Sequence, residues 1–145
     1  MAIDTCTNFV SATSTVLDWA RARVNTVGTL ADTCEIFEQA NEQQIFSWIH
    51  KATRNQAVVQ YDGSTYNRDG SPRRVLKFNV WVVYRYTTNR ISGQTSAVTL
   101  MDSVIAALDH ETSADFMCYV VADTAKDFPH AGLSVYLASF VVEDY

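Results

Sequence analysis

Glycine and proline are scarce in this chain of 145 residues, which has five Gly and two Pro. That scarcity excludes a collagen-like or low-complexity chain, and 48% hydrophobic with 19% charged residues excludes intrinsic disorder. No run approaches the roughly 18 consecutive apolar residues of a membrane-spanning helix. Since the length is that of one folded unit, we expect residues 1–145 to form a single domain.

Cysteine is also sparse and has no pairing pattern. The three residues Cys6, Cys34 and Cys118 are odd in number and contain no CxxC pair, so a disulfide framework is not expected and a reducing compartment is favoured. The first residues lack the basic region of a signal peptide. The sequence therefore predicts a protein made in the cytoplasm, with no membrane partner.

Motifs that carry chemistry are missing as well. The sequence has no GxGxxG, Walker loop, GxSxG or HExxH, and the two Asp-Gly pairs are too short for calcium loops. His50, His110 and His130 lie far apart and lack the spacing of metal ligands. We therefore predict no catalytic, cofactor-binding or metal-binding residues and no enzymatic activity.

Charge is present but strongly segregated along the chain. The formal net charge of −5 argues against a dedicated nucleic-acid-binding protein. Residues 51–90 nevertheless carry eight Lys or Arg against two Asp, whereas residues 91–145 carry one Lys against eight acids, and residues 1–50 two Arg against six acids. A basic middle between acidic flanks indicates that copies of the chain associate with one another.

Hydrophobic periodicity predicts three helices and five strands. The helices are expected at about residues 3–24, 41–49 and 96–108, and the strands at 33–38, 57–61, 75–86, 116–122 and 133–142. Turn-forming residues fill 62–73, and Ser92-Gly93 is expected to break the chain. The order α-β-α-β-β-α-β-β predicts an α+β fold, with helices packed on one face of a mainly antiparallel sheet.

The strand at 133–142 is apolar on both faces. Such a strand lies either inside a sheet that is covered on both sides or in a subunit contact. The sequence leaves both open.

Basic residues gather on the hairpin formed by the second and third strands. Alternation places Lys77, Trp81 and Arg85 on the outward face of the third strand, where a large aromatic among charges is typical of an interface. The predicted subunit or partner interface is Arg68, Arg73 and Arg74 at the hairpin tip, with Lys77, Trp81 and Arg85 along the strand.

Several local patterns resemble a known family. An apolar strand runs into Tyr61-Asp62-Gly63-Ser64, and Asn89-Arg90 precedes the helix at 96–108. Together with the order of elements, these patterns resemble the tail terminator (tail-completion) proteins of long-tailed bacteriophages, in particular the Mu-like group. The likeness extends over nearly the whole chain, apart from the acidic and aromatic ending at 142–145.

The resemblance implies a non-enzymatic virion protein at the head-proximal end of the tail, assembled in the host cytoplasm. Proteins of this family form a homohexameric ring that caps the tail tube and offers a docking surface to the head. The implied partners are further copies of the chain, the tail tube protein and a head-completion or connector protein. DNA would pass through the central hole without specific binding.

Two other functions are compatible with the residues. A small cytosolic, dimeric α+β enzyme or ligand-binding protein would use Cys34 or a histidine in a cleft between subunits. A nucleic-acid-binding module would use the Arg and Trp side chains of the hairpin against phosphate and base.

Overall fold

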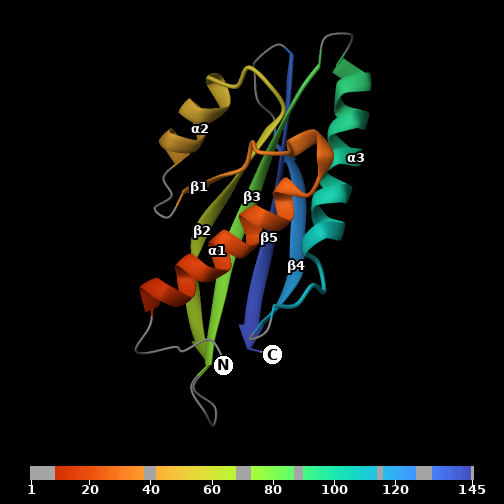
Figure 1. The fold of residues 1–145 in the computed structure, drawn as a ribbon. Coiled ribbons are helices and arrows are strands. Elements are labelled where there is room, and N and C mark those ends of the chain that lie inside the picture. The colour runs from red at the N-terminus through yellow and green to blue at the C-terminus, as the bar shows by residue number, and fades with distance from the viewer. Residues whose placement is uncertain are drawn as a thin grey trace.

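The computed structural model describes residues 9–37, 42–67, 73–86, 90–113, 116–126 and 132–144. These segments form three α-helices, a short 3-10 turn and one five-stranded sheet (Figure 1). The elements in chain order are α1 (Phe9–Asn25), the turn Gly28–Leu30, β1 (Glu35–Phe37), α2 (Glu42–His50), β2 (Gln56–Asn67), β3 (Arg73–Arg85), α3 (Arg90–Leu108), β4 (Phe116–Lys126) and β5 (Leu133–Asp144). The predicted α+β class and element order are confirmed.

The sheet has the strand order β1-β2-β3-β5-β4. β1 pairs in parallel with β2, and the other three pairings are antiparallel, so the sheet is mainly antiparallel as predicted. β3 is the central strand, and β1 and β4 form the two edges. The two edges of the sheet are therefore made by different strands.

One face of the sheet carries the larger core. Leu76, Phe78, Val80 and Val82 of β3 point to this face and are buried against α1 and α3 (Figure 1). The stacked rings of Phe78 and Phe140, with centroids 5.2 Å apart, join β3 to β5 there. Within the described ranges, no helix is long and apolar enough to cross a bilayer.

The opposite face is covered in part by α2. Ile45 and Ile49 of α2 pack against Trp81 and Val83 of β3 and against Val135 of β5. The expectation that the helices lie on one face is therefore wrong for α2. Because alternate residues of β3 and β5 are apolar on both sides, each strand needs cover on both faces, and α2 supplies part of it.

Two local predictions are also wrong. Asp62-Gly63 does not end β2 but forms a β-bulge, with Gly63 at φ 95°, after which pairing with β3 resumes at Ser64 and Leu76. A bulge accommodates extra residues without ending the ladder, and glycine adopts positive φ readily. Ser92-Gly93 lies inside α3 rather than before it, because one Gly costs a long helix only about 1 kcal/mol.

A buried guanidinium joins α1 to the hairpin of β2 and β3. Arg74 is fully buried, and its Nε donates to Ser64 Oγ at 2.8 Å. Its Nη2 donates to Thr13 Oγ1 of α1 at 2.5 Å and to Tyr61 Oη at 3.2 Å. The hydroxyl groups of Tyr61 and Ser64 are themselves 2.9 Å apart. Arg74 therefore fixes the position of α1 on the sheet through hydrogen bonds as well as through apolar contact.

Replacing Arg74 with Met should lower the free energy of unfolding by about 2 kcal/mol or more, because hydrogen bonds from a charged donor contribute about 1.5–3 kcal/mol. Urea unfolding followed by circular dichroism measures the change. The matched control is Lys77→Met, at a partly exposed position on the other face of β3, for which we expect a change within about 0.5 kcal/mol. Equal effects of the two substitutions would contradict the assigned role of Arg74.

Candidate functional site

Of the three basic residues predicted at the hairpin tip, only Arg74 has a described side chain. Arg68 lies outside the described residues, and Arg73 is the first residue of β3. Arg74 points into the larger core instead of toward a partner, because it continues the alternation of Leu76 and Phe78. The apolar face of the strand thus extends one position further toward the tip than the sequence interpretation placed it.

The three residues predicted along the strand lie on one face of β3 but differ in how far they are exposed: Lys77, Trp81 and Arg85. Trp81 is only 8% exposed and packs under α2, so the prediction of an exposed aromatic is wrong. Lys77 lies partly exposed four residues away. Arg85 is exposed, and its Nη1 donates to the carbonyl of Ala52 at 3.2 Å. Whether Lys77 and Arg85 contact a second copy stays a prediction.

A chain of polar side chains crosses the sheet beside α2. The indole Nε1 of Trp81 donates to Gln60 Oε1 at 2.7 Å, and Asn79 Nδ2 donates to the same oxygen at 3.3 Å. Ser139 Oγ in turn donates to Asn79 Oδ1 at 2.8 Å. These bonds satisfy the indole N–H of the buried Trp81 and the side-chain oxygen of the buried Gln60, so this region is ordered packing and not an open binding surface.

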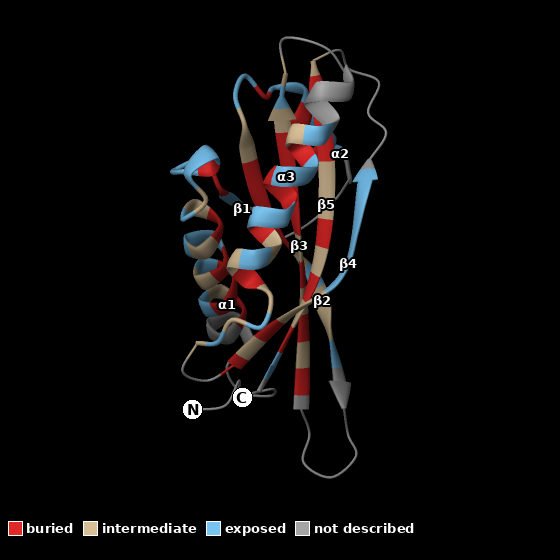
Figure 2. Ribbon diagram, turned by 90° about the vertical axis from the view of Figure 1, so that its right-hand side faces the viewer, coloured by how far each residue is buried: buried red, intermediate tan, exposed pale blue. Residues whose placement is uncertain are grey.

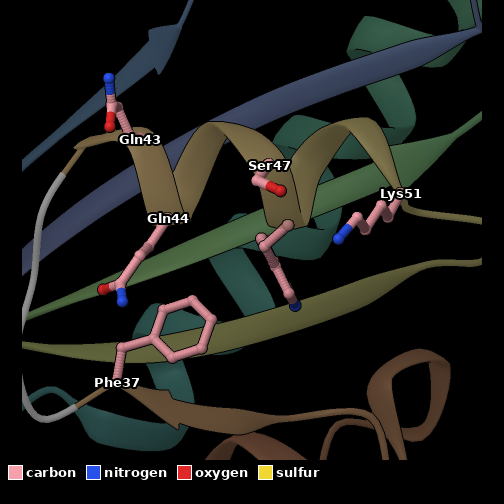
Figure 3. Close-up of a pocket in the computed structure, with 6 residues that line it drawn as sticks. Phe37, Gln43, Gln44, Ser47 and Lys51 are labelled. Atoms are coloured by element: carbon pink, nitrogen blue, oxygen red, sulfur yellow. The ribbon is translucent and has the colours of Figure 1, made fainter.

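A groove lies between α2 and the edge strand β1. Its volume is about 420 Å³, and the aromatic rings of Phe37 and Trp48 meet in it edge to face, with centroids 6.5 Å apart. Figure 3 shows Gln44 reaching toward the Phe37 ring and Lys51 just beyond the end of the helix. We call this the α2 groove; its lining residues are Phe37, Gln43, Gln44, Ser47, Trp48 and Lys51.

The α2 groove has a cation at its end. Among the described residues that line it, Lys51 is the one charged side chain; the exposed Arg54 follows three residues later, and the exposed Glu35 lies on β1 two residues before Phe37. Within the described segments, no ion pair joins Lys51 or Arg54 to a carboxylate. An aromatic wall beside an unpaired cation suits a segment that carries both apolar and acidic groups.

Sequence reasoning missed the α2 groove. Phe37 and Lys51 are 14 positions apart, on either side of a helix whose periodicity indicates only that Ile45, Trp48 and Ile49 share a face. The groove arises because β1 forms the edge of the sheet and α2 lies beside it, and that arrangement has no local signature in the sequence.

No metal centre is assembled among the residues that the structure describes. His50 ends α2, His110 follows α3, and His130 lies outside the described residues.

His110 Nδ1 contacts Asp109 Oδ2 at 2.9 Å. The amide of Val120 donates to Asp109 Oδ1 at 2.9 Å and, together with the adjacent imidazole, holds the pKa of Asp109 below its usual range. The pair of Asp109 and His110 links the end of α3 to β4 through the hydrogen bond from Val120, which is a structural role.

The thiols of Cys34 and Cys118 lie in the larger core. Burial raises the pKa of Cys34 to about 12 and also raises the pKa of Cys118. A thiol is nucleophilic only as the thiolate, so neither group is suited to attack a substrate at neutral pH. This counts against the alternative in which Cys34 serves as a reactive group in a cleft.

In a Cys6→Ser background, both remaining thiols should react with a disulfide reagent at pH 8 at least about a hundredfold more slowly than in the chain unfolded in urea. The folded thiols keep their protons above pH 9, where unfolded thiols lose theirs, so we also expect stability to fall as the pH rises above 9. Rapid labelling of Cys34 in the folded chain would contradict this assignment.

Comparison with known proteins finds a likeness in fold but not in sequence. No protein-family model matches the chain, and no curated protein matches it. Among solved structures, a chain from the virion of a native gene transfer agent (GTA) particle is similar, with a TM-score of 0.50 and 11% sequence identity. The alignment covers 83% of this chain and 83% of that chain. At this identity the likeness shows a shared fold, which extends over most of both chains.

Proposed function

We propose that this chain is a virion structural protein that forms a homohexameric ring, terminates a phage tail tube and offers the head its docking surface. The observation that carries the proposal is the fold shared with a chain of a gene transfer agent virion, over 83% of both chains. The local patterns at Tyr61-Asp62-Gly63-Ser64 and Asn89-Arg90, which resemble tail terminators, support it independently of the fold.

The site chemistry is consistent with a structural role. Among the described residues, the cysteines are buried with raised pKa values, and no group of metal ligands is assembled. The sheet also has two unlike edges, and a cyclic assembly requires that each copy present two different surfaces. In this proposal the partners are neighbouring copies, the tail tube protein and a head-completion or connector protein, and DNA passes through the ring without specific binding.

Exposed acidic side chains are compatible with the inner surface of a ring through which DNA passes without binding. Asp102 and Glu143 are exposed on α3 and β5, respectively. Phosphates are repelled by carboxylates, so a lumen lined with such groups would not retain DNA.

A test of tube termination uses the tail tube protein of the same virion. Added at equimolar amounts to polymerising tube protein, the chain should shorten the tubes seen by electron microscopy, with extra density on one tube end. The matched addition is the Arg74→Met variant after thermal unfolding, which should leave tube length unchanged. Tubes of equal length and bare ends with the native chain would contradict the proposed function.

A further inference from the structure

The second half of β4 is an exposed edge with an apolar and acidic character. Residues 121–125 are all exposed, and Figure 2 shows this part of β4 in pale blue beside the buried strands. Val121 is 63% exposed, the most of any large hydrophobic side chain described, and it lies at a β-bulge between Val120 and Ala122. Asp123 follows two residues later. We call residues 121–125 the β4 rim.

The β4 rim has a valine where a monomeric protein would place a charge. Edge strands are commonly protected by bulges and charged side chains, and bulges also turn a side chain toward a partner. The rim has the bulge, but its most exposed residue is apolar, which is a feature of contact surfaces. Asp123 forms no ion pair within the described residues.

The α2 groove lies at the other edge of the same sheet and has complementary chemistry. It offers the rings of Phe37 and Trp48 for an apolar side chain and the ammonium of Lys51 for a carboxylate. Trp48 and Lys51 are three residues apart on α2 and its end, which separates them by about 5–6 Å. Val121 and Asp123 are two residues apart on a strand, which separates them by about 7 Å. The apolar and charged groups therefore match in kind, and both pairs lie within about one helical turn or two strand residues of each other.

We propose that the α2 groove of one copy binds the β4 rim of a second copy, with Val121 against Phe37 and Trp48 and with Asp123 paired to Lys51. This inference rests on the proposed ring and names the two surfaces that join its copies. Because β1 and β4 are opposite edges, a single chain cannot bring its own rim into its own groove. The contact is head-to-tail, and such a contact generates a ring when the rotation between neighbouring copies closes and a filament when it does not; the proposed ring requires the first.

The contact also joins two residues from segments of opposite net charge. Lys51 belongs to the basic middle segment, and Asp123 to the acidic last segment. Each copy presents Lys51 at one edge of the sheet and Asp123 at the other, so the two groups attract each other across the contact. Such complementarity fixes the orientation of neighbours more than it adds affinity.

Charge reversal tests the contact directly, with light scattering behind a sizing column as the readout of mass. Lys51→Glu and Asp123→Lys should each raise the concentration for half-assembly by at least about tenfold, because each places like charges together. The double variant Lys51→Glu/Asp123→Lys restores opposite charges at every contact and should return assembly toward that of the native chain. Val121→Ser should weaken assembly without changing the circular dichroism spectrum.

Matched controls reverse exposed charges elsewhere. Asp102→Lys on α3 and Arg21→Glu on α1 make the same net-charge changes and should leave assembly unaltered. If Lys51→Glu, Asp123→Lys and Val121→Ser all leave the concentration for half-assembly at its native value, the proposed docking surfaces are wrong, while the proposed ring still stands. A native chain that stays monomeric at every concentration would overturn both the docking surfaces and the ring.

Discussion

Burial of both faces of the central strand β3 determines where every helix lies. One face of β3 is apolar from Leu76 to Val82 and is covered by α1 and α3. The other face carries Trp81 and Val83, which need a second cover, and α2 supplies it. The helix has nine residues and is about 13 Å long, whereas the 13 residues of β3 extend about 43 Å. α2 therefore covers only part of the second face.

The placement of α2 has consequences at the edge of the sheet. To reach Trp81, the helix lies beside the short strand β1 and leaves the α2 groove between Phe37 and Trp48. Among the described residues, no helix covers the second half of β4 at the far edge, and residues 121–125 are exposed there. The two edges of the sheet therefore differ, and a closed ring of identical copies requires two different surfaces on each copy.

Much of the fold could be predicted from the sequence because period-two and period-3.6 patterns are strong in this chain. The alternation from Leu76 to Arg85 predicts β3, and the stripe from Ala97 to Leu108 predicts most of α3. The pairing register of the strands and the side chains that each helix covers could not be predicted in the same way. The sequence predicts Arg74 to be a surface charge because its three hydroxyl partners come from α1 and β2. It predicts Trp81 to be exposed because the helix that covers it, α2, comes from a distant part of the sequence.

The candidate site was less predictable than the fold, because it is built from pairs of elements. Lys77 and Arg85 lie on the predicted face, but the polar bonds of Gln60 with Trp81 and Asn79 show that the middle of this face is internal packing. The groups available for contact lie at the two edges of the sheet, in the α2 groove and in the β4 rim. Which strands form the edges depends on the topology of the sheet. A sequence pattern identifies a strand, but not whether that strand ends the sheet.

The central claim is that copies of this chain close into a ring through unlike surfaces. Electron microscopy of the purified protein tests it most directly, since class averages reveal both the number of copies and their symmetry. The account predicts rings of six copies with a central hole and no two-fold axis in the plane of the ring. Single chains at every concentration, or dimers related by a two-fold axis, would contradict it.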